Sequence, residues 1–116
     1  MPGTVIYHNP RCSKSRQTLE LLNERGVEAQ VVEYLQTPPD ATTLRGILDM
    51  LGIEPRELMR SDEPEYRDLN LDDASLSREQ LIAAMVAHPR LIQRPIVVRD
   101  GRAALGRPPE QVLGIL

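Results

Sequence analysis

The apolar positions in the first third of the chain change spacing twice. Residues 4–7 (TVIY) form a short apolar run that stops at Asn9-Pro10, which is typical of a buried strand followed by a turn. Helical spacing follows over residues 13–25, and Gly26 is suited to end that helix. Residues 29–35 (AQVVEYL) are rich in β-formers and indicate a second strand. This order predicts a β-α-β unit.

The middle of the chain is patterned for helices. Gly52 follows four apolar residues at the i, i+3, i+4 and i+7 spacing of one helix face, namely Leu44, Ile47, Leu48 and Leu51. A proline is suited to open another short helix over residues 55–59. Ser77 and Gln80 have the spacing of a capping box ahead of one more helix. We therefore expect a helical insertion over about residues 40–90.

Strand patterns return near the end of the chain. Residues 96–98 (IVV) and 102–105 (RAAL) flank Asp100-Gly101, a pair suited to the type I′ turn of a hairpin, and residues 108–110 (PPE) are typical of a helix start. The order β-α-β, helices, β-β-α belongs to the α/β class. It matches the thioredoxin-like fold, a four-stranded mixed sheet with the insertion between its halves, although a generic α/β sandwich gives a similar pattern. We expect a single domain over residues 1–116.

Composition narrows the class of protein. The net charge of −3 and the sequence pI of about 5.4 argue against nucleic-acid binding through a basic surface. No apolar run approaches the roughly 18 residues of a membrane helix, and residues 1–4 lack the pattern of a secretory leader. Cys12 is the sole cysteine of the 116 residues, which excludes an internal disulfide and fits a reducing, cytoplasmic compartment.

Cys12 follows the first strand at the expected start of the first helix. A free cysteine is often a small buried hydrophobe, but the surrounding residues 8–16 (HNPRCSKSR) are polar apart from one proline. Unpaired N–H groups and the helix dipole favour a thiolate there. Arg11, Lys14 and Arg16 crowd this positive helix end, which indicates an anion among them, the thiolate or a bound oxyanion. For Arg11 and Lys14 a solvent-facing role is equally supported, whereas function is favoured for Arg16.

Three further arginines are candidates for binding an oxyanion. Arg94 precedes a proline ahead of a strand, where we predict a cis bond, and Arg107 precedes the Pro-Pro pair of the last helix. Arg60 ends a short helix, where it could simply complement the helix dipole. Several guanidinium groups on one anion would be specific, because their planar fork matches oxyanions in a bidentate way.

Other thiol and metal chemistries are disfavoured by spacing. A phosphatase-type loop needs arginine six positions after the cysteine, where this chain has Thr18. The sequence from Cys12 to Ser15 is C-x-x-S, so a resolving thiol must come from another molecule. One cysteine with His8 and the distant His88 does not make a zinc site, and we expect no metal.

These motifs together resemble one family. The stretch HNPRCSKSR at residues 8–16, Arg94-Pro95-Ile96, and the segment Arg107-Pro108-Pro109-Glu110 are similar to the ArsC family of glutaredoxin-linked arsenate reductases. The likeness runs from about Val5 to the C-terminus, as in a compact, chromosomal-type member. It implies a thioredoxin-like fold with a helical insertion, and a cytoplasmic enzyme of arsenical resistance.

The resemblance also implies roles for individual residues. Cys12 would be the nucleophile that attacks arsenate, His8 would influence its pKa, and Ser15 would hydrogen-bond the thiolate. Arsenate would bind through Arg60, Arg94 and Arg107, and Arg16, favoured above for its place at the helix end, is a further candidate for binding arsenate. Glutathione would attack the adduct as co-substrate and glutaredoxin would reduce the mixed disulfide, with no bound cofactor. Ser13 and Lys14 are bulkier than the small residues that the family's reductases typically carry after the cysteine.

Two other functions stay open on this fold. One is a glutathione-dependent thiol oxidoreductase acting on a different substrate. The other is a redox-responsive regulator of the Spx branch that contacts RNA polymerase. Those regulators usually carry C-x-x-C as a switch, and Ser15 in place of the second cysteine argues against that function here.

Overall fold

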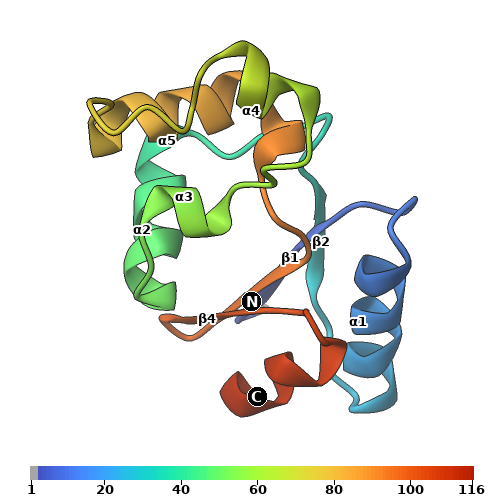
Figure 1. The fold of residues 1–116 in the computed structure, drawn as a ribbon. Helices are drawn as coiled ribbons and strands as arrows, with labels where there is room; N and C mark the ends of the chain where they lie inside the picture. The colour runs from blue at the N-terminus through green and yellow to red at the C-terminus, as the bar shows by residue number, and fades with distance from the viewer. Residues whose placement is uncertain (1–2) are drawn as a thin grey trace. The chain divides into compact units, whose positions relative to one another are not determined.

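The computed structural model describes residues 3–116 (Figure 1). Met1 and Pro2, part of the stretch considered above as a possible leader, lie outside the described residues. The chain divides into two compact units, one formed by the residues up to Thr37 together with Arg94–Leu116, the other by Pro38–Gln93. We call these the sheet unit and the helical unit; a single domain over the whole chain stays a prediction. Within residues 3–116, no helix combines the length and apolar character needed to cross a membrane.

The sheet unit is built on four strands in the order β2-β1-β3-β4. Strand β1 pairs in parallel with β2 and antiparallel with β3, and β3 pairs antiparallel with β4. The elements are β1 (Thr4–His8), α1 (Ser13–Glu24), β2 (Gln30–Glu33), β3 (Ile96–Arg99) and β4 (Arg102–Leu105). The predicted β-α-β unit and the four-stranded mixed sheet of an α/β fold are therefore confirmed.

One edge of this sheet gathers three chain segments. Tyr7, near the end of β1, lies opposite Ile96 at the start of β3, and Ile96 lies opposite Leu105 at the end of β4. The Gly106 amide then donates to the Pro95 carbonyl at 3.0 Å. The loop after β1, the entry to β3 and the exit of β4 therefore meet at the same edge.

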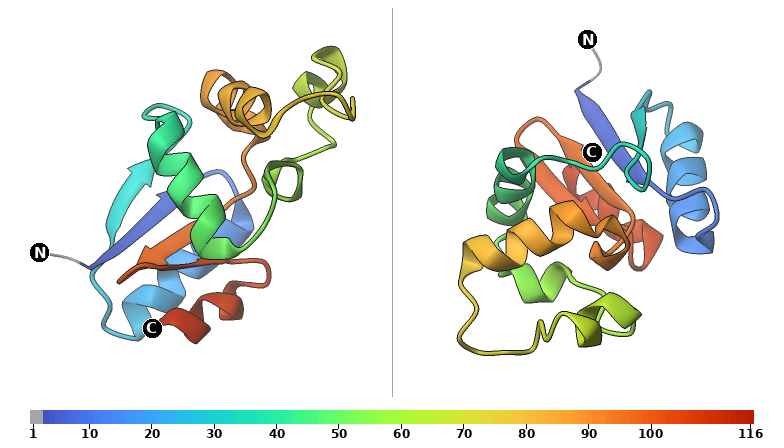
Figure 2. Two further views of the ribbon diagram at one scale, coloured as in Figure 1. Left: turned by 90° about the vertical axis from the view of Figure 1, so that its left-hand side faces the viewer. Right: turned by 90° about the horizontal axis from the view of Figure 1, so that it is seen from above.

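Helix α1 and the last element, η2 (Pro109–Ile115), cover one face of the sheet (Figure 2). Their fully buried contacts with β1 and β3 are made by Ile6, Leu22, Val97 and Val112. The last element is a 3₁₀ helix where an ordinary helix was expected. Its turns are closed by i,i+3 bonds, such as the one from the Gln111 amide to the Pro108 carbonyl at 3.0 Å, and 3₁₀ helices of this kind are common in short pieces of chain.

The β3–β4 turn matches its prediction. Asp100 has φ of 50° and Gly101 has φ of 77°, as a two-residue type I′ turn requires at both central positions. Gly101 accepts this conformation without steric cost, and Asp is among the few other residues that tolerate it.

The helical unit contains four helices and a 3₁₀ turn: α2 (Ala41–Leu51), α3 (Pro55–Leu58), α4 (Pro64–Asp68), α5 (Arg78–Ala87) and η1 (Pro89–Leu91). Helix α2 ends at Gly52 with φ of 68°, as predicted. The capping box is confirmed. The backbone amide of Gln80 donates to Ser77 Oγ at 3.1 Å, and the backbone amide of Ser77 donates to Gln80 Oε1 at 2.7 Å.

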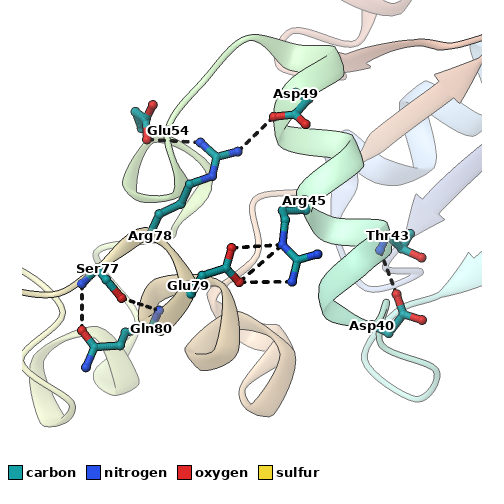
Figure 3. Close-up of polar contacts among 9 residues, drawn as sticks. All are labelled: Asp40, Thr43, Arg45, Asp49, Glu54, Ser77, Arg78, Glu79 and Gln80. Atoms are coloured by element: carbon teal, nitrogen blue, oxygen red, sulfur yellow. Dashed lines mark hydrogen bonds and ion pairs between the residues drawn. The ribbon is translucent and has the colours of Figure 1, made fainter.

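Helices α2 and α5 pack together through apolar side chains, among them the fully buried Leu44, Leu48, Ile82 and Met85. Exposed ion pairs add to this contact (Figure 3). Arg45 of α2 pairs with Glu79 of α5 at 3.0 Å. Arg78 of α5 reaches Asp49 at 3.1 Å and Glu54 at 3.4 Å, which links α5 to the end of α2 and to the start of α3.

Candidate functional site

Cys12 is the N-cap residue of α1. Its backbone is extended, with φ of −94° and ψ of 124°, and its carbonyl accepts the first helical bond from the Arg16 amide at 3.0 Å. The Cys12 amide donates to the Asn9 carbonyl at 3.0 Å, which closes a tight turn between β1 and α1. The side chain of an N-cap residue faces the unpaired amides of the first helical turn, and here that side chain is a partly exposed thiol.

This placement shifts the pKa of Cys12. Partial burial acts to raise the pKa of the thiol, but three hydrogen bonds act in the opposite direction. They come from the Ser15 amide, the Arg94 side chain and the Lys14 amide, and the charge of Arg94 adds to them. The balance lies below the ordinary pKa of a thiol, so the structure favours the nucleophilic thiolate.

Arg94 has capacity for a second anion. Its guanidinium interacts with the Cys12 sulfur, yet its Nε is buried and has no hydrogen-bond partner among residues 3–116. A buried, unpartnered N–H of a cation is costly unless an acceptor is bound. Arg94 also follows the predicted backbone geometry, because the Arg94–Pro95 bond is cis.

The Ser15 side chain does not follow its expected role. Its hydroxyl accepts the Asn9 amide at 3.0 Å and lies 2.5 Å from His8 Nδ1, whereas its backbone amide serves the Cys12 thiol. Ser15 is fully buried, so the hydroxyl fastens the first helical turn to the end of β1. The role of Ser15 toward the thiolate stays a prediction, and the structure places its backbone amide, not its hydroxyl, against the Cys12 thiol.

His8 is buried and is the last residue of β1. Burial lowers the pKa of His8, the charge of Glu33 raises it and that of Arg16 lowers it, with a net lowering. The imidazole is therefore neutral at neutral pH. A neutral ring cannot attract a thiolate as a cation would, and the contact that the structure shows for His8 is the one with the Ser15 hydroxyl.

The other candidate arginines occupy different surroundings. Arg16 is exposed and its Nη1 donates to the Pro10 carbonyl at 3.0 Å, across the Cys12 turn. Arg107 is exposed directly after Gly106, at the sheet edge that also carries Cys12 and Arg94. Arg60 belongs to the helical unit, where it pairs with two carboxylates, Glu63 at 3.1 Å and Asp62 at 3.6 Å.

Comparison with known proteins decides the family. The chain matches the ArsC family model over residues 7–115. It belongs to the ArsC family. This ArsC protein is 63% identical over 112 residues to "Uncharacterized protein YfgD" of Escherichia coli K12, covering 96% of this chain and 94% of the relative. It is 48% identical over 117 residues to the arsenate reductase of Neisseria meningitidis serogroup A, covering all of both chains.

A solved structure agrees with this assignment. The arsenate reductase from Vibrio cholerae superposes with a TM-score of 0.95 at 54% sequence identity and covers 97% of both chains. The predicted thioredoxin-like fold of the ArsC protein is thereby confirmed.

Sequence reasoning missed a close contact behind the site. A Cβ placed on Gly106 would lie 2.7 Å from Pro95 Cγ and would collide with Thr18 Oγ1 of α1. Thr18 is fully buried and donates to the Lys14 carbonyl at 2.8 Å. This contact joins α1, the entry to β3 and the exit of β4, which are the segments that carry Cys12, Arg94 and Arg107. A glycine directly before Arg107 was the available signal.

Asn9 was also read only as a turn residue. Its buried side chain accepts the Arg11 amide at 3.0 Å, an Asx turn that shapes the loop leading to Cys12. Arg107–Pro108 is a second cis bond that was not predicted. Among residues 3–116, no group of three or more His, Cys, Asp or Glu side chains is arranged to hold a metal ion.

Proposed function

We propose that this ArsC protein reduces arsenate to arsenite, with Cys12 as the nucleophile and with glutathione and glutaredoxin as reductants. The observation that carries the proposal is the Cys12 thiol at the N-cap of α1, with its pKa lowered beside Arg94, whose buried Nε has no hydrogen-bond partner among residues 3–116. A nucleophile and a cation with spare donor capacity suit an oxyanion substrate. The named arsenate reductases among its relatives support the choice of arsenate.

The first step forms a bond between sulfur and arsenic. The Cys12 thiolate attacks the arsenic of arsenate, and one arsenate oxygen, after accepting protons, leaves as water. Arsenic keeps its +5 state, because an S–As bond replaces an O–As bond. Arg94 balances the negative charge of the adduct, with Arg107 and Arg16 as further cations.

The second step transfers the electrons. A glutathione thiolate attacks Cys12 Sγ, a disulfide bond forms, and the S–As bond breaks with its electron pair moving to arsenic. Arsenic is reduced from +5 to +3 and leaves as arsenite, while the two sulfur atoms are oxidised to the Cys12–glutathione disulfide. A glutaredoxin thiolate then removes the glutathione and restores the Cys12 thiolate. Because Cys12 is the only cysteine, the second thiol has to be supplied by another molecule.

Among the proposed arsenate ligands, Arg60 is the one whose charge is already paired with carboxylates within residues 3–116. Its guanidinium is paired with Glu63 and Asp62, so two carboxylates compete for its charge. We therefore expect Arg60 to contribute less to arsenate binding than Arg94, which forms no ion pair with a carboxylate among residues 3–116.

The decisive experiment is an arsenate-dependent coupled assay. Purified protein, glutathione, glutaredoxin, glutathione reductase and NADPH are combined, and NADPH oxidation is followed with and without arsenate. We expect arsenate-dependent oxidation that Cys12→Ser abolishes. Reduction of glutathionylated thiols without any response to arsenate would reject the proposal and support the general thiol oxidoreductase instead.

A further inference from the structure

A small recess is lined in part by the loop that leads from β1 to Cys12, and it lies on the other side of β1 from Arg94. It has a volume of about 160 Å³ and is lined by residues of the two loops that follow β1 and β2, namely His8, Asn9, Pro10, Arg11, Glu33, Leu35 and Gln36. Crevices outside the carboxyl ends of parallel strands are common places for ligands in α/β proteins. Since β1 lies between β2 and β3, the recess and Arg94 flank the Cys12 loop from opposite sides.

Both walls of the recess are held in place by hydrogen bonds. On the β1 side, the Asn9 carbonyl accepts the Cys12 amide, and Asn9 Oδ1 accepts the Arg11 amide. On the β2 side, the Glu33 carbonyl accepts the amides of Gln36 at 3.0 Å and Thr37 at 2.9 Å. The recess is thus formed before any ligand binds, which lowers the entropic cost of binding.

The polar groups of the recess carry both signs. Arg11 supplies a cation, and Glu33 supplies a carboxylate on the opposite wall. His8 Nδ1 is occupied by Ser15, which leaves Nε2 as its other polar atom. Because Ser15 Oγ already accepts the Asn9 amide, both groups are satisfied when the hydroxyl donates to Nδ1 and the neutral ring carries its proton on Nε2. Two donors and one carboxylate match an amino-acid head group, which has a carboxylate and an ammonium.

We propose that this recess binds the γ-glutamyl head group of glutathione, with Glu33 facing its ammonium and Arg11 and His8 Nε2–H facing its α-carboxylate. The inference rests on the proposed function for the identity of the thiol. Leu35, which is 40% exposed, and Pro10 supply apolar contact for the methylene groups. Pockets for whole drug-sized ligands run to about 300–1,000 Å³, so this recess fits one end of the tripeptide.

The position of the recess also fits the geometry of the second step. A thiolate attacks a sulfur atom from the side opposite to the bond that breaks. If arsenic is held on the Arg94 side of Cys12 Sγ, the incoming sulfur must approach from the other side. A glutathione anchored in the recess presents its thiol from that direction, forms the bond to Sγ and leaves the S–As electron pair to arsenic.

The test uses a mixed disulfide and needs no arsenate. Cys12 is the sole cysteine, so Ellman's reagent labels it uniquely with thionitrobenzoate, and a thiol that attacks Sγ releases the coloured leaving group. We expect the rate to saturate with glutathione and with γ-glutamylcysteine. It should rise linearly with cysteinylglycine, which lacks the head group, and with 2-mercaptoethanol.

Variants of the recess sharpen the test. Glu33→Gln and Arg11→Gln should each lower the ratio of the glutathione rate to the 2-mercaptoethanol rate by roughly tenfold, the effect of losing one charge-assisted bond. The ratio cancels any change in the intrinsic reactivity of Cys12. Glu20→Gln and Arg25→Gln remove the same charges from exposed positions of the same unit and should leave the ratio unchanged.

A linear response to glutathione in the wild type, or an unchanged ratio in both recess variants, overturns the proposal. Saturation by cysteinylglycine would overturn the choice of the γ-glutamyl end. Circular dichroism checks that each variant is folded. All four replaced residues are exposed, so we expect each variant to fold. If glutathione saturates as expected while arsenate is not reduced in the coupled assay, the recess stands and the arsenate reductase proposal fails.

Discussion

The arginines of the two units are used in different ways. In the helical unit, Arg45, Arg78 and Arg90 pair with carboxylates on neighbouring elements. In the sheet unit, Arg94 interacts with the Cys12 thiol and Arg16 with the Pro10 carbonyl. The charges of these three helical arginines are therefore neutralised by carboxylates, whereas Arg16 and Arg94 form no ion pair with a carboxylate among residues 3–116 and stay available to an anion. The comparison separates arginines that serve structure from those that can serve a ligand.

The energetics follow from exposure. The side chains of Arg45 and Glu79 are 41% and 61% exposed, and ion pairs of that kind are each worth about 0–1 kcal/mol. The stability of the helical unit comes instead from its buried aliphatic residues. Arg94, in contrast, lies beside the partly buried Cys12 thiol, and its positive charge lowers the pKa of that thiol.

The largest expected effect is on anion binding beside Cys12, when Arg94 is replaced. Arsenate, or sulfate as an unreactive mimic, should protect Cys12 from alkylation by iodoacetamide. Arg94→Lys keeps the charge but loses the bidentate geometry, so the concentration needed for protection should rise roughly tenfold to a hundredfold. Arg78→Lys in the helical unit is the matched control and should change nothing.

Arg107→Lys should weaken protection in the same direction, and Arg60→Lys should do so least, because Glu63 and Asp62 already engage Arg60. If the wild-type protein shows no protection by either anion, the proposed arginine site does not exist. An equal response of Arg78→Lys and Arg94→Lys would show that general charge, rather than a site, is responsible.

A second effect concerns the pKa of Cys12. The thiolate is stabilised in the folded protein, so alkylation should remain fast as the pH falls below the ordinary thiol pKa of about 8.5 and should slow only near the lowered value. Arg94→Gln removes one of the causes and should move the midpoint upward, whereas Arg78→Gln should leave it in place. A wild-type midpoint at or above that of a free thiol would contradict the interpretation of the Cys12 environment.

Local signals made most of the fold predictable from the sequence. Gly52, the Ser77–Gln80 capping box and the Asp100-Gly101 turn each act within a few residues, and each was found where expected. The last element was predicted as an ordinary helix and is a 3₁₀ helix, because apolar spacing over seven residues does not distinguish i,i+3 from i,i+4 hydrogen bonding. Local chemistry specifies where elements begin and end more firmly than it specifies their geometry.

The candidate site was predictable only in part. The sequence indicated Cys12 through its place at a helix start, since N-cap chemistry is local. The use of the Ser15 amide, with its hydroxyl turned to His8, depends on how β1 and α1 meet. The contact of Gly106 with Thr18 joins residues far apart in the chain, and no local pattern reports it.

A third effect tests that long-range contact. Gly106→Ala places a methyl group against Thr18 and Pro95, and such overpacking typically costs about 1–3 kcal/mol of unfolding free energy. We expect lower stability in urea unfolding and weaker arsenate protection of Cys12, because Arg107 and Arg94 are displaced from α1. Gly46→Ala, a glycine of the helical unit with open space around its Cα, is the control and should retain protection. Wild-type stability of Gly106→Ala would contradict this prediction, because it would mean that Thr18 and Pro95 can move to accommodate the methyl group at little cost in free energy.

The smallest expected effect lies in the helical unit and completes the comparison. Ser77→Ala removes the hydroxyl that accepts the Gln80 amide and so leaves one donor of the first turn of α5 without its cap. Loss of such a cap costs about 0.5–2 kcal/mol of unfolding free energy. Urea unfolding should show this loss, while the rate and pH dependence of Cys12 alkylation stay at wild-type values, since the change alters no group that sets the thiol pKa. Ser77→Asp should restore most of the stability, because Asp is an equally good cap and adds a negative charge at the positive helix end. A change in Cys12 reactivity with Ser77→Ala would show that the two units are energetically coupled, and the division of arginines into structural and ligand-binding sets would then have to be drawn across the whole chain.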